Sequence, residues 1–236
     1  MTLAVTFDYG QTLAELDTRY LAKRALERDV LVEVGALDAA GPKAWGEYNA
    51  AKVRGESAFD AWSSFMTTLL RGAGARKKSA SAEDVVPALV DFLWSEQPKK
   101  NLWRRPIEGM DGLVRELSEA GVPLGIVSNS EGKLRELVDE MGFGRYFPVV
   151  ADSGVLGFEK PDRRIFDWTA ERLGVGTTDL VHVGDAFAAD VEGALGVGAV
   201  AIWFTAEKRK GLPSRVLTCS TAGAVRTALT GLGILQ

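Results

Sequence analysis

The chain has 236 residues, and its 28 lysines and arginines against 32 aspartates and glutamates give a formal net charge of -4. A hydrophobic content of 46% and a charged content of 25% are ordinary for a folded domain and exclude a disordered chain. The mild acidity argues against the basic face that nucleic acid binding needs. One cysteine and one histidine exclude an intrachain disulfide and any metal site built from several of these residues.

The first part of the chain is predicted to hold one strand followed by a block of helices. Residues 3–7 form a short apolar, β-branched run that ends at a polar turn, which is typical of a buried strand. No comparable run follows between residues 16 and 95. Apolar residues recur there at helical spacing, and the predicted helices cover residues 16–34, 44–53, 59–70 and 82–94.

Strands and helices alternate in the rest of the chain. The predicted strands cover residues 123–127, 147–150, 180–183 and 199–204. The predicted helices cover residues 110–120, 131–141, 161–173, 190–195 and 222–229. Short strands that alternate with helices indicate a parallel sheet with helices on both faces. We therefore expect an α/β fold in which an all-helical segment is inserted after the first strand.

Polar residues that could carry chemistry lie close to the ends of the predicted strands. They are Asp8, Thr12, Ser128, Asn129, Asp185 and Asp190, together with Lys160 before the helix that leads into the fourth strand. In an open parallel sheet a ligand binds beyond the carboxyl ends of the strands, so these residues are expected on one rim. His182 instead alternates with apolar neighbours inside a strand and is predicted to be a core histidine.

The residue types on this rim suit phosphoryl transfer. Three carboxylates repel one another, and a cation would relieve that repulsion. An oxygen-rich site without histidine or cysteine suits Mg²⁺. A carboxylate such as Asp8 can attack phosphorus as a covalent nucleophile while the metal neutralises the phosphoryl oxygens. The hydroxyl of Ser128 and the ammonium of Lys160 would hold the phosphate and stabilise developing charge.

Four motifs resemble, in order, those of the haloacid dehalogenase-like (HAD) hydrolase superfamily. Residues 7–13 (FDYGQTL) resemble its nucleophile loop, and residues 125–129 (GIVSN) its Ser/Thr motif. Residues 157–161 (GFEKP) resemble its lysine motif, and residues 183–190 (VGDAFAAD) its acidic metal motif. The helical segment after the first strand is similar to the cap of one subclass, so the chain is identified as a member of that subclass.

The resemblance implies a Rossmann-like parallel sheet core with an all-helical cap domain inserted after the first strand. The core domain would consist of residues 1–14 and 104–236, and the cap domain of residues 15–103. In this arrangement the cap would close over the site, exclude water and set the specificity for the substrate.

The resemblance also implies a role for each motif residue. Asp8 would be the nucleophile, and Ser128 and Lys160 would act in catalysis and bind the phosphate. Thr12, which would also order the nucleophile loop, and Asn129 would complete the phosphate-binding set. The implied ligands of Mg²⁺ are Asp8, the backbone carbonyl of Gly10, Asp185 and Asp190, the last directly or through water.

Gly10 departs from the pattern of the superfamily's phosphatases. These enzymes usually carry a second aspartate at this position, which protonates the leaving oxygen and later activates water. General acid–base catalysis contributes about 10²–10⁴-fold to a rate, so its loss predicts a slow phosphatase. Glu15, Asp17 or a residue of the cap could supply the missing carboxylate, and the sequence leaves these alternatives open.

The predicted function is that of a Mg²⁺-dependent phosphatase that acts on a small phosphorylated metabolite through an aspartyl-phosphate intermediate. One alternative is a hydrolytic haloacid dehalogenase, because the same aspartate can attack carbon. The other is a non-catalytic member of the fold that binds a phosphorylated ligand or a protein. No signal peptide or membrane-spanning run is visible, so we expect a cytoplasmic protein without a nucleic acid or membrane partner. The sequence leaves the substrate and the oligomeric state open.

Overall fold

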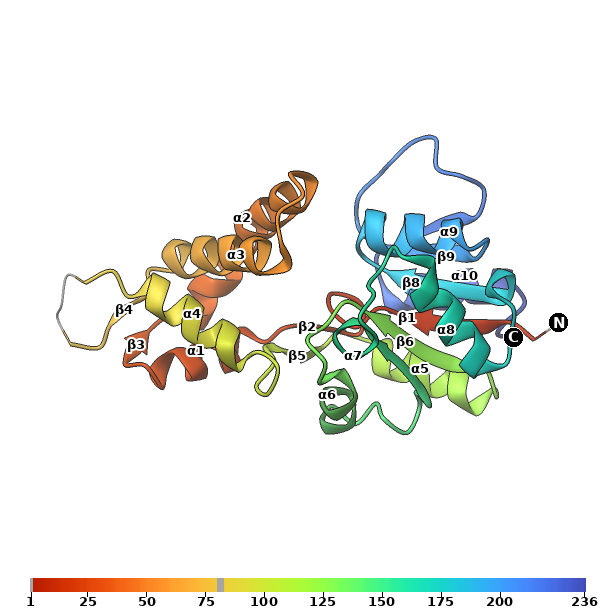
Figure 1. Ribbon diagram of the computed structural model, residues 1–236, viewed down its shortest axis with the longest axis horizontal. Helices are drawn as coiled ribbons and strands as arrows, with labels where there is room; N and C mark the ends of the chain where they lie inside the picture. Colours follow the sequence, from red (N-terminus) through yellow and green to blue (C-terminus); the bar gives the residue numbers. More distant parts are fainter. Residues whose placement is uncertain (1, 80–82) are drawn as a thin grey trace. The chain divides into compact units, whose positions relative to one another are not determined.

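The computed structural model describes residues 2–79 and 83–236, and the chain forms two compact units (Figure 1). The first unit consists of Met1–Glu15 together with Trp103–Gln236, and the second is Leu16–Leu102. The second unit is therefore an insertion between the first strand of the first unit and the remainder of that unit.

A six-stranded sheet forms the centre of the first unit, with the strand order β10-β9-β8-β1-β6-β7. Its strands are β1 (Ala4–Phe7), β6 (Leu124–Ser128), β7 (Val149–Asp152), β8 (Leu180–Gly184), β9 (Val200–Phe204) and β10 (Val216–Cys219). All neighbouring strands in this sheet run parallel. The expected parallel sheet is confirmed, and β1 lies at its centre between β6 and β8.

Helices lie against both faces of this sheet (Figure 1). They are α5 (Met110–Glu119), α6 (Leu134–Glu140), α7 (Ser153–Leu156), α8 (Arg163–Leu173), η1 (Thr177–Asp179), η2 (Phe187–Glu192), α9 (Gly193–Gly196) and α10 (Ala222–Gly231). Side chains of a strand alternate between faces. Val5 and Phe7 of β1 accordingly pack in one core with Met110 of α5, whereas Ala4 packs in the other with Phe166 of α8. The α/β fold class is confirmed.

Some elements of the first unit differ from the expected ones. Strand β10 was not predicted, because its four residues alternate only weakly in burial and lie at the edge of the sheet. The helix expected over 190–195 is instead the π-helical turn η2 followed by α9. Strands β2 (Ala14–Leu16) and β5 (Trp103–Pro106) form a separate two-stranded sheet at the points where the chain passes between the units.

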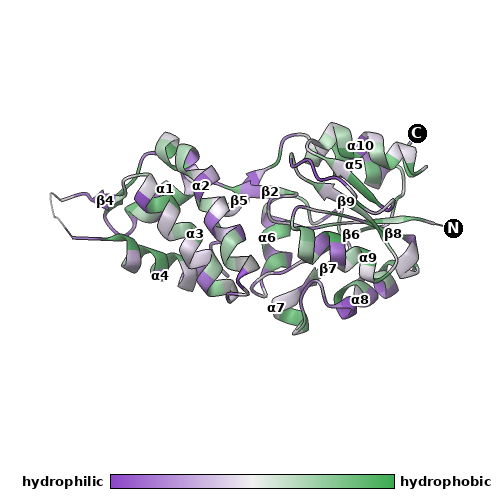
Figure 2. Cartoon of the chain, turned by 90° about the horizontal axis from the view of Figure 1, so that it is seen from above, coloured by the Kyte–Doolittle hydropathy of each residue, from purple (hydrophilic) through white to green (hydrophobic). Residues whose placement is uncertain are grey.

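The second unit is mainly helical. Its helices in the described residues are α1 (Thr18–Leu26), α2 (Val34–Val53), α3 (Ala58–Gly72) and α4 (Val86–Glu96). Phe65, Met66 and Leu69 of α3 are buried, and apolar and polar residues are interspersed along the helices (Figure 2). This is the pattern of helices that bury one face in a shared core.

The helix predicted over 16–34 ends early, at Leu26. Asp29 has a left-handed φ of 56°, which interrupts helical geometry, and its carbonyl accepts a hydrogen bond from the Lys78 amide at 2.8 Å. β3 (Val30–Leu31) then pairs antiparallel with β4 (Arg76–Lys77), a short ladder in the otherwise helical unit. Residue 82, the expected start of the helix predicted over 82–94, lies outside the described residues. Within the described residues, none of the helices has the length and apolar character needed to cross a membrane.

Candidate functional site

A buried lysine joins two carboxylates at the carboxyl end of the central strands. The Lys160 ammonium donates to Asp8 Oδ1 at 2.7 Å and to Asp190 Oδ1 at 2.6 Å. The side chains of Lys160 and Asp190 are only 2% and 1% exposed. Asp8 directly follows β1, so three residues that are distant in the sequence meet here, as the position of their motifs after the strands predicts.

Asp185 completes a cluster of three carboxylates. We call Asp8, Asp185 and Asp190 the acidic cluster: each offers one carboxylate oxygen, and these oxygens all lie within 4.8 Å of one another. Asp185 directly follows β8, and its backbone carbonyl accepts a hydrogen bond from the Trp203 indole at 2.8 Å. Oxygen donors at this spacing could hold a hard divalent cation.

The turn after β8 places Asp190 by close packing against the backbone. A π-helical segment such as η2 is uncommon and often marks a functional site. The Ala186 amide donates to Asp190 Oδ2 at 2.8 Å, which turns the side chain back toward the start of the segment. A Cβ atom on Gly184 would lie 2.2 Å from Asp190 Cγ. Only glycine at position 184 therefore leaves room for the Asp190 carboxylate.

The charges of the acidic cluster are only partly compensated. Burial, followed by the charges of Asp8 and Asp190, raises the pKa of Asp185 well above its usual range. Burial also raises the pKa of Asp8, against the opposing effect of Lys160. Burial acts in the same direction on Asp190, but Lys160 and His182 outweigh it and hold the pKa of Asp190 low. One ammonium cannot neutralise three ionised carboxylates, so full ionisation of the cluster is costly without a bound cation.

The Ser/Thr motif brings two further residues to this rim. Ser128, the last residue of β6, is buried, and its hydrogen bond to Asp8 counteracts the rise in the pKa of that carboxyl. Asn129 instead uses its side-chain amide on the backbone of Lys160. Its Nδ2 donates to the Lys160 carbonyl at 3.0 Å, and its Oδ1 accepts from the Lys160 amide at 2.8 Å. Asn129 thus fixes the backbone that carries the lysine, and its predicted contact with phosphate stays a prediction.

The loop after Asp8 is tightly folded. Gln11 adopts a left-handed φ of 56° and donates its amide to the Ala14 carbonyl at 2.8 Å. Thr12 is fully buried, and its hydroxyl has no hydrogen-bond partner within the described part of the chain. A Cβ atom on Gly10 would lie 3.6 Å from Trp103 Cδ1, which is ordinary contact. The glycine is therefore not required by steric crowding.

Both named replacements for the missing carboxylate have other partners. Glu15 Oε1 accepts from Arg105 Nε at 2.9 Å in an exposed ion pair. Asp17 Oδ1 accepts from the Tyr20 amide at 2.9 Å and caps the first turn of α1. These contacts give both side chains structural roles and leave the source of the proton open.

Two residues near the site were not predicted to support it. His182 is a core histidine, as expected, but its Nε2 lies 3.0 Å from Asp190 Oδ1. Asp152 ends β7 next to Ser128 in register and accepts hydrogen bonds from the turn that follows β6. The signal for Asp152 was available, since it is a carboxylate at the end of a strand like Asp8 and Asp185.

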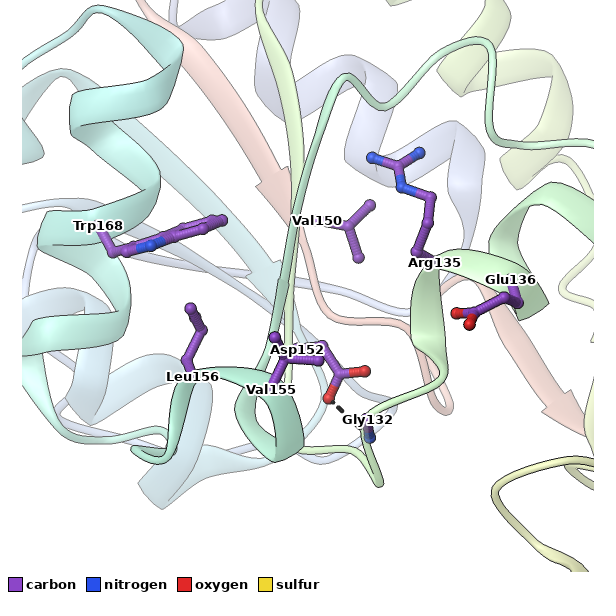
Figure 3. A pocket seen from close by; sticks show the side chains of 8 residues that line it. All are labelled: Gly132, Arg135, Glu136, Val150, Asp152, Val155, Leu156 and Trp168. Atoms are coloured by element: carbon purple, nitrogen blue, oxygen red, sulfur yellow. Dashed lines mark hydrogen bonds between the residues drawn. The ribbon is translucent and has the colours of Figure 1, made fainter.

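A small cavity of about 150 Å³ lies beside Asp152, between β7, α6, α7 and α8 (Figure 3). Figure 3 shows the Asp152 carboxylate turned toward Gly132, with Trp168 and Leu156 on the other side of the strand. No member of the acidic cluster and no atom of Lys160 lines this cavity. It is therefore separate from the candidate site.

Comparisons with known proteins agree with the sequence motifs. A family model described as haloacid dehalogenase-like hydrolase matches residues 3–198. "Haloacid dehalogenase-like hydrolase domain-containing protein 3" of Bos taurus is 28% identical over 58% of this chain and 52% of its own length. "Glyceraldehyde 3-phosphate phosphatase" of Methanothermobacter thermautotrophicus is 34% identical over 44% of this chain and 46% of its own length. The matches thus span about half the length of these curated relatives.

One solved structure extends the likeness over the whole chain. The crystal structure of a HAD phosphatase from Thermococcus onnurineus has a TM-score of 0.61 at 23% identity. The alignment covers 98% of this chain and 99% of that one. At this identity the comparison shows a shared fold and no more. The aligned region includes the inserted helical unit as well as the sheet.

Proposed function

The chain belongs to the haloacid dehalogenase-like hydrolase family, and we propose that it is a Mg²⁺-dependent phosphatase of small phosphorylated metabolites. One observation carries this proposal: the Lys160 ammonium bridges Asp8 and Asp190 while Asp185 supplies a third carboxylate oxygen within 4.8 Å. The match to a curated phosphatase over part of the chain supports the same reaction class.

The donor set of the acidic cluster fits Mg²⁺. It consists of carboxylate oxygens, and burial together with two neighbouring charges makes ionised Asp185 costly without a cation. Asp8 and Asp185 would bind the ion directly, the Gly10 carbonyl would add a neutral oxygen, and Asp190 would contribute directly or through water. When bound, Mg²⁺ would neutralise phosphoryl oxygens and so allow an anionic nucleophile to approach phosphorus.

The proposed reaction uses Asp8 as the nucleophile. One of its carboxylate oxygens forms a bond to phosphorus while the bond from phosphorus to the leaving oxygen breaks, which gives an aspartyl phosphate and the free alcohol after proton uptake. Water then attacks phosphorus, releases inorganic phosphate and restores the Asp8 carboxylate. Lys160 and Ser128 would hold the phosphoryl oxygens throughout, and Thr12 would order the loop. The proton for the leaving oxygen does not come from position 10, so we expect slow turnover.

Residues 15–103 are proposed as the cap domain, and the choice of substrate is assigned to it. The helical unit supplies none of the acidic cluster, Ser128 or Lys160, all of which belong to the first unit. Chemistry and selection would thus be carried by separate parts of the chain.

A panel of phosphorylated metabolites, assayed for phosphate release with Mg²⁺ and with EDTA, tests the proposal. We expect release with Mg²⁺ and none with EDTA. Halide release from a 2-haloacid that persists in EDTA would establish the dehalogenase alternative. Binding of a phosphorylated compound without turnover of any would establish the non-catalytic alternative.

A further inference from the structure

We propose that His182 is a positioning residue that fixes the orientation of the Asp190 carboxylate and, through it, the place of the Lys160 ammonium beside Asp8. The kinetic part of this inference rests on the proposed phosphatase function. The hydrogen-bond part concerns the chain's own residues and can be tested without turnover.

The ring of His182 is held at both nitrogens. His182 lies on β8 directly opposite Thr6 on β1, and its Nδ1 is 2.9 Å from Thr6 Oγ1. Its Nε2 is 3.0 Å from Asp190 Oδ1. Phe166 of α8 packs edge-on against the ring, with centroids 5.2 Å apart. The imidazole therefore has a fixed plane, and one edge of it faces the acidic cluster.

The direction of these hydrogen bonds follows from the acceptor. An ionised carboxylate can only accept hydrogen bonds, so Nε2 must carry the proton that is shared with Asp190. In the neutral ring Nδ1 then accepts from the Thr6 hydroxyl, whose proton is free to rotate toward it. The Asp190 carboxylate thus selects the form of the ring, and the Thr6 hydroxyl accommodates that form by donating to Nδ1, as outer partners do for histidines in other sites.

The remaining contacts show what this donation controls. Asp190 Oδ1 accepts from both His182 and Lys160, and Oδ2 accepts from the Ala186 amide. A carboxylate offers about four acceptor positions, so one is left, on Oδ2, for a cation or its water. Loss of the His182 donor would leave Lys160 as the remaining donor to Oδ1 and would loosen the orientation of the Asp190 carboxylate about its terminal bond. Lys160 would then lose the fixed acceptor that holds it 2.7 Å from Asp8.

The only histidine in the chain makes the first test direct. Imidazole ¹⁵N and ¹³C resonances of this 236-residue chain, prepared without a histidine tag, report on His182 alone. We expect a protonated Nε2 whose proton exchanges slowly with water, because the ring is buried. A ring protonated on Nδ1 only, with a bare Nε2, would overturn the inference whether or not the protein is an active phosphatase.

A pair of substitutions supplies the kinetic test. In His182→Gln the side-chain amide reaches about as far as Nε2 and keeps a donor for Asp190, whereas in His182→Asn it reaches only as far as Nδ1. Both variants lose the ring and its contact with Phe166, so loss of packing affects them alike. We expect His182→Gln to retain most of kcat and His182→Asn to lose about 10–100-fold, the usual effect of removing a partner that orients a ligand residue. KM should change little in either.

Two further measurements separate positioning from general destabilisation. Thermal unfolding of both variants shows whether they are folded at the assay temperature. Thr6→Val, which removes the hydroxyl but leaves the ring able to donate, should reduce kcat less than His182→Asn does. Equal kcat values for folded His182→Gln and His182→Asn would refute the positioning role. If the parent protein lacks phosphatase activity, the proposed function fails, and the nuclear magnetic resonance result still decides the inference.

Discussion

Asp152 and Asp190 are both buried carboxylates near the carboxyl edge of the same sheet, yet they are stabilised in different ways. Asp152 accepts hydrogen bonds from the amides of Gly132, Leu134 and Gly154 at 2.9–3.0 Å and from the Ser130 hydroxyl at 2.8 Å. These donors are neutral and come from the two turns that the carboxylate ties together. Asp190 takes a single backbone donor and is otherwise held by Lys160 and His182.

The difference distinguishes a carboxylate with a structural role from one proposed to take part in catalysis, although both lie at the same edge of the sheet. The amide and hydroxyl donors around Asp152 satisfy its carboxylate oxygens, so this carboxylate needs no bound ion. Around Asp190 the compensating group is an ammonium that Asp8 also uses, and Asp185 remains without an equivalent partner in the described residues. Of these two described regions, the acidic cluster is therefore the one expected to bind a divalent cation, and substitutions in the two regions should have different consequences.

The largest contrast is expected from the same chemical change at Asp8 and at Asp152. Asp8→Asn keeps the shape of the side chain but removes the anionic nucleophile, so phosphate release should fall by at least about 10³-fold. Circular dichroism should show an intact fold. Steady-state phosphate release measures the loss, and near-parental turnover in Asp8→Asn would exclude the covalent mechanism. Asp152→Asn is the matched control, and its turnover per folded molecule should stay close to that of the parent.

The next contrast concerns the cation. Asp185→Ala removes a carboxylate ligand, and we expect the Mg²⁺ affinity and kcat to fall together by at least about 100-fold, because substitutions that merely reorient a ligand already cost about 10–100-fold. Calorimetric Mg²⁺ titration and the Mg²⁺ dependence of the rate provide the two measurements. Activity that survives both this substitution and EDTA would support the dehalogenase alternative.

The raised pKa of Asp185 also predicts a pH-dependent effect of Mg²⁺ on stability. In the metal-free protein the pKa of Asp185 is higher in the folded than in the unfolded chain, so the protonated form of Asp185 stabilises the folded state. Its stabilising contribution is complete below the unfolded-state pKa of about 3.9 and is lost as the pH rises through the raised folded-state value. Mg²⁺ requires the ionised form, so it should raise Tm more at pH 8 than at pH 5.

The size of this effect follows from binding linkage. Mg²⁺ at 100 times its Kd would stabilise the folded state by about 2.7 kcal/mol. Thermal unfolding with and without Mg²⁺ across this pH range measures it. Asp152→Asn should keep the Mg²⁺-dependent increase in Tm and Asp185→Ala should lose it. An increase of the same size at both pH values would contradict the assignment of Asp185 as a ligand that must ionise.

The Asp152 region should instead respond in stability. Asp152→Ala leaves the buried amide of Leu134 and the half-buried amide of Gly132 without their acceptor, and an unsatisfied buried donor costs about 1–3 kcal/mol. Urea unfolding should show this loss as a lower midpoint. A fully stable Asp152→Ala protein with strongly reduced kcat would contradict the structural role of Asp152 and would indicate that Asp152 acts in the reaction instead.

These two regions also show what could be predicted from the sequence. Asp8, Lys160, Asp185 and Asp190 meet because each stands in a motif that the parallel topology brings to the same edge, and topology follows from the order of short strands and helices. The fold class could be predicted for the same reason. The hydrogen-bond partner of each side chain could not be predicted, since it depends on strand register and side-chain direction. His182 contacts Asp190 only because β8 pairs with β1 and η2 turns back over Gly184.

Local conflicts explain the elements that were missed. Leu31 extends a helical apolar pattern, yet the left-handed Asp29 ends the helix and the chain pairs with β4 instead. β10 is short and lies at the edge of the sheet, where one flank has no neighbouring strand to enforce a strong apolar pattern. In both cases contacts with residues distant in the sequence determined the structure, and such contacts cannot be predicted from the pattern of one short segment.

The smallest expected effect is a gain at Gly10. The backbone there is not left-handed, and a Cβ atom would meet only Trp103, at 3.6 Å from Cδ1 and 3.7 Å from Nε1, so neither the backbone nor the space for Cβ opposes a side chain at this position. Gly10→Asp should supply the missing acid and raise kcat for an aryl phosphate by about 10-fold, the low end of what general acid catalysis contributes. Gly10→Asn, which matches aspartate in size but cannot act as an acid, is the control. Mg²⁺ affinity should change less, because the proposed ligand at this position is the backbone carbonyl. A folded Gly10→Asp protein with unchanged kcat would mean that another group already delivers the proton, and substitutions of Glu15 and Asp17 would then identify it.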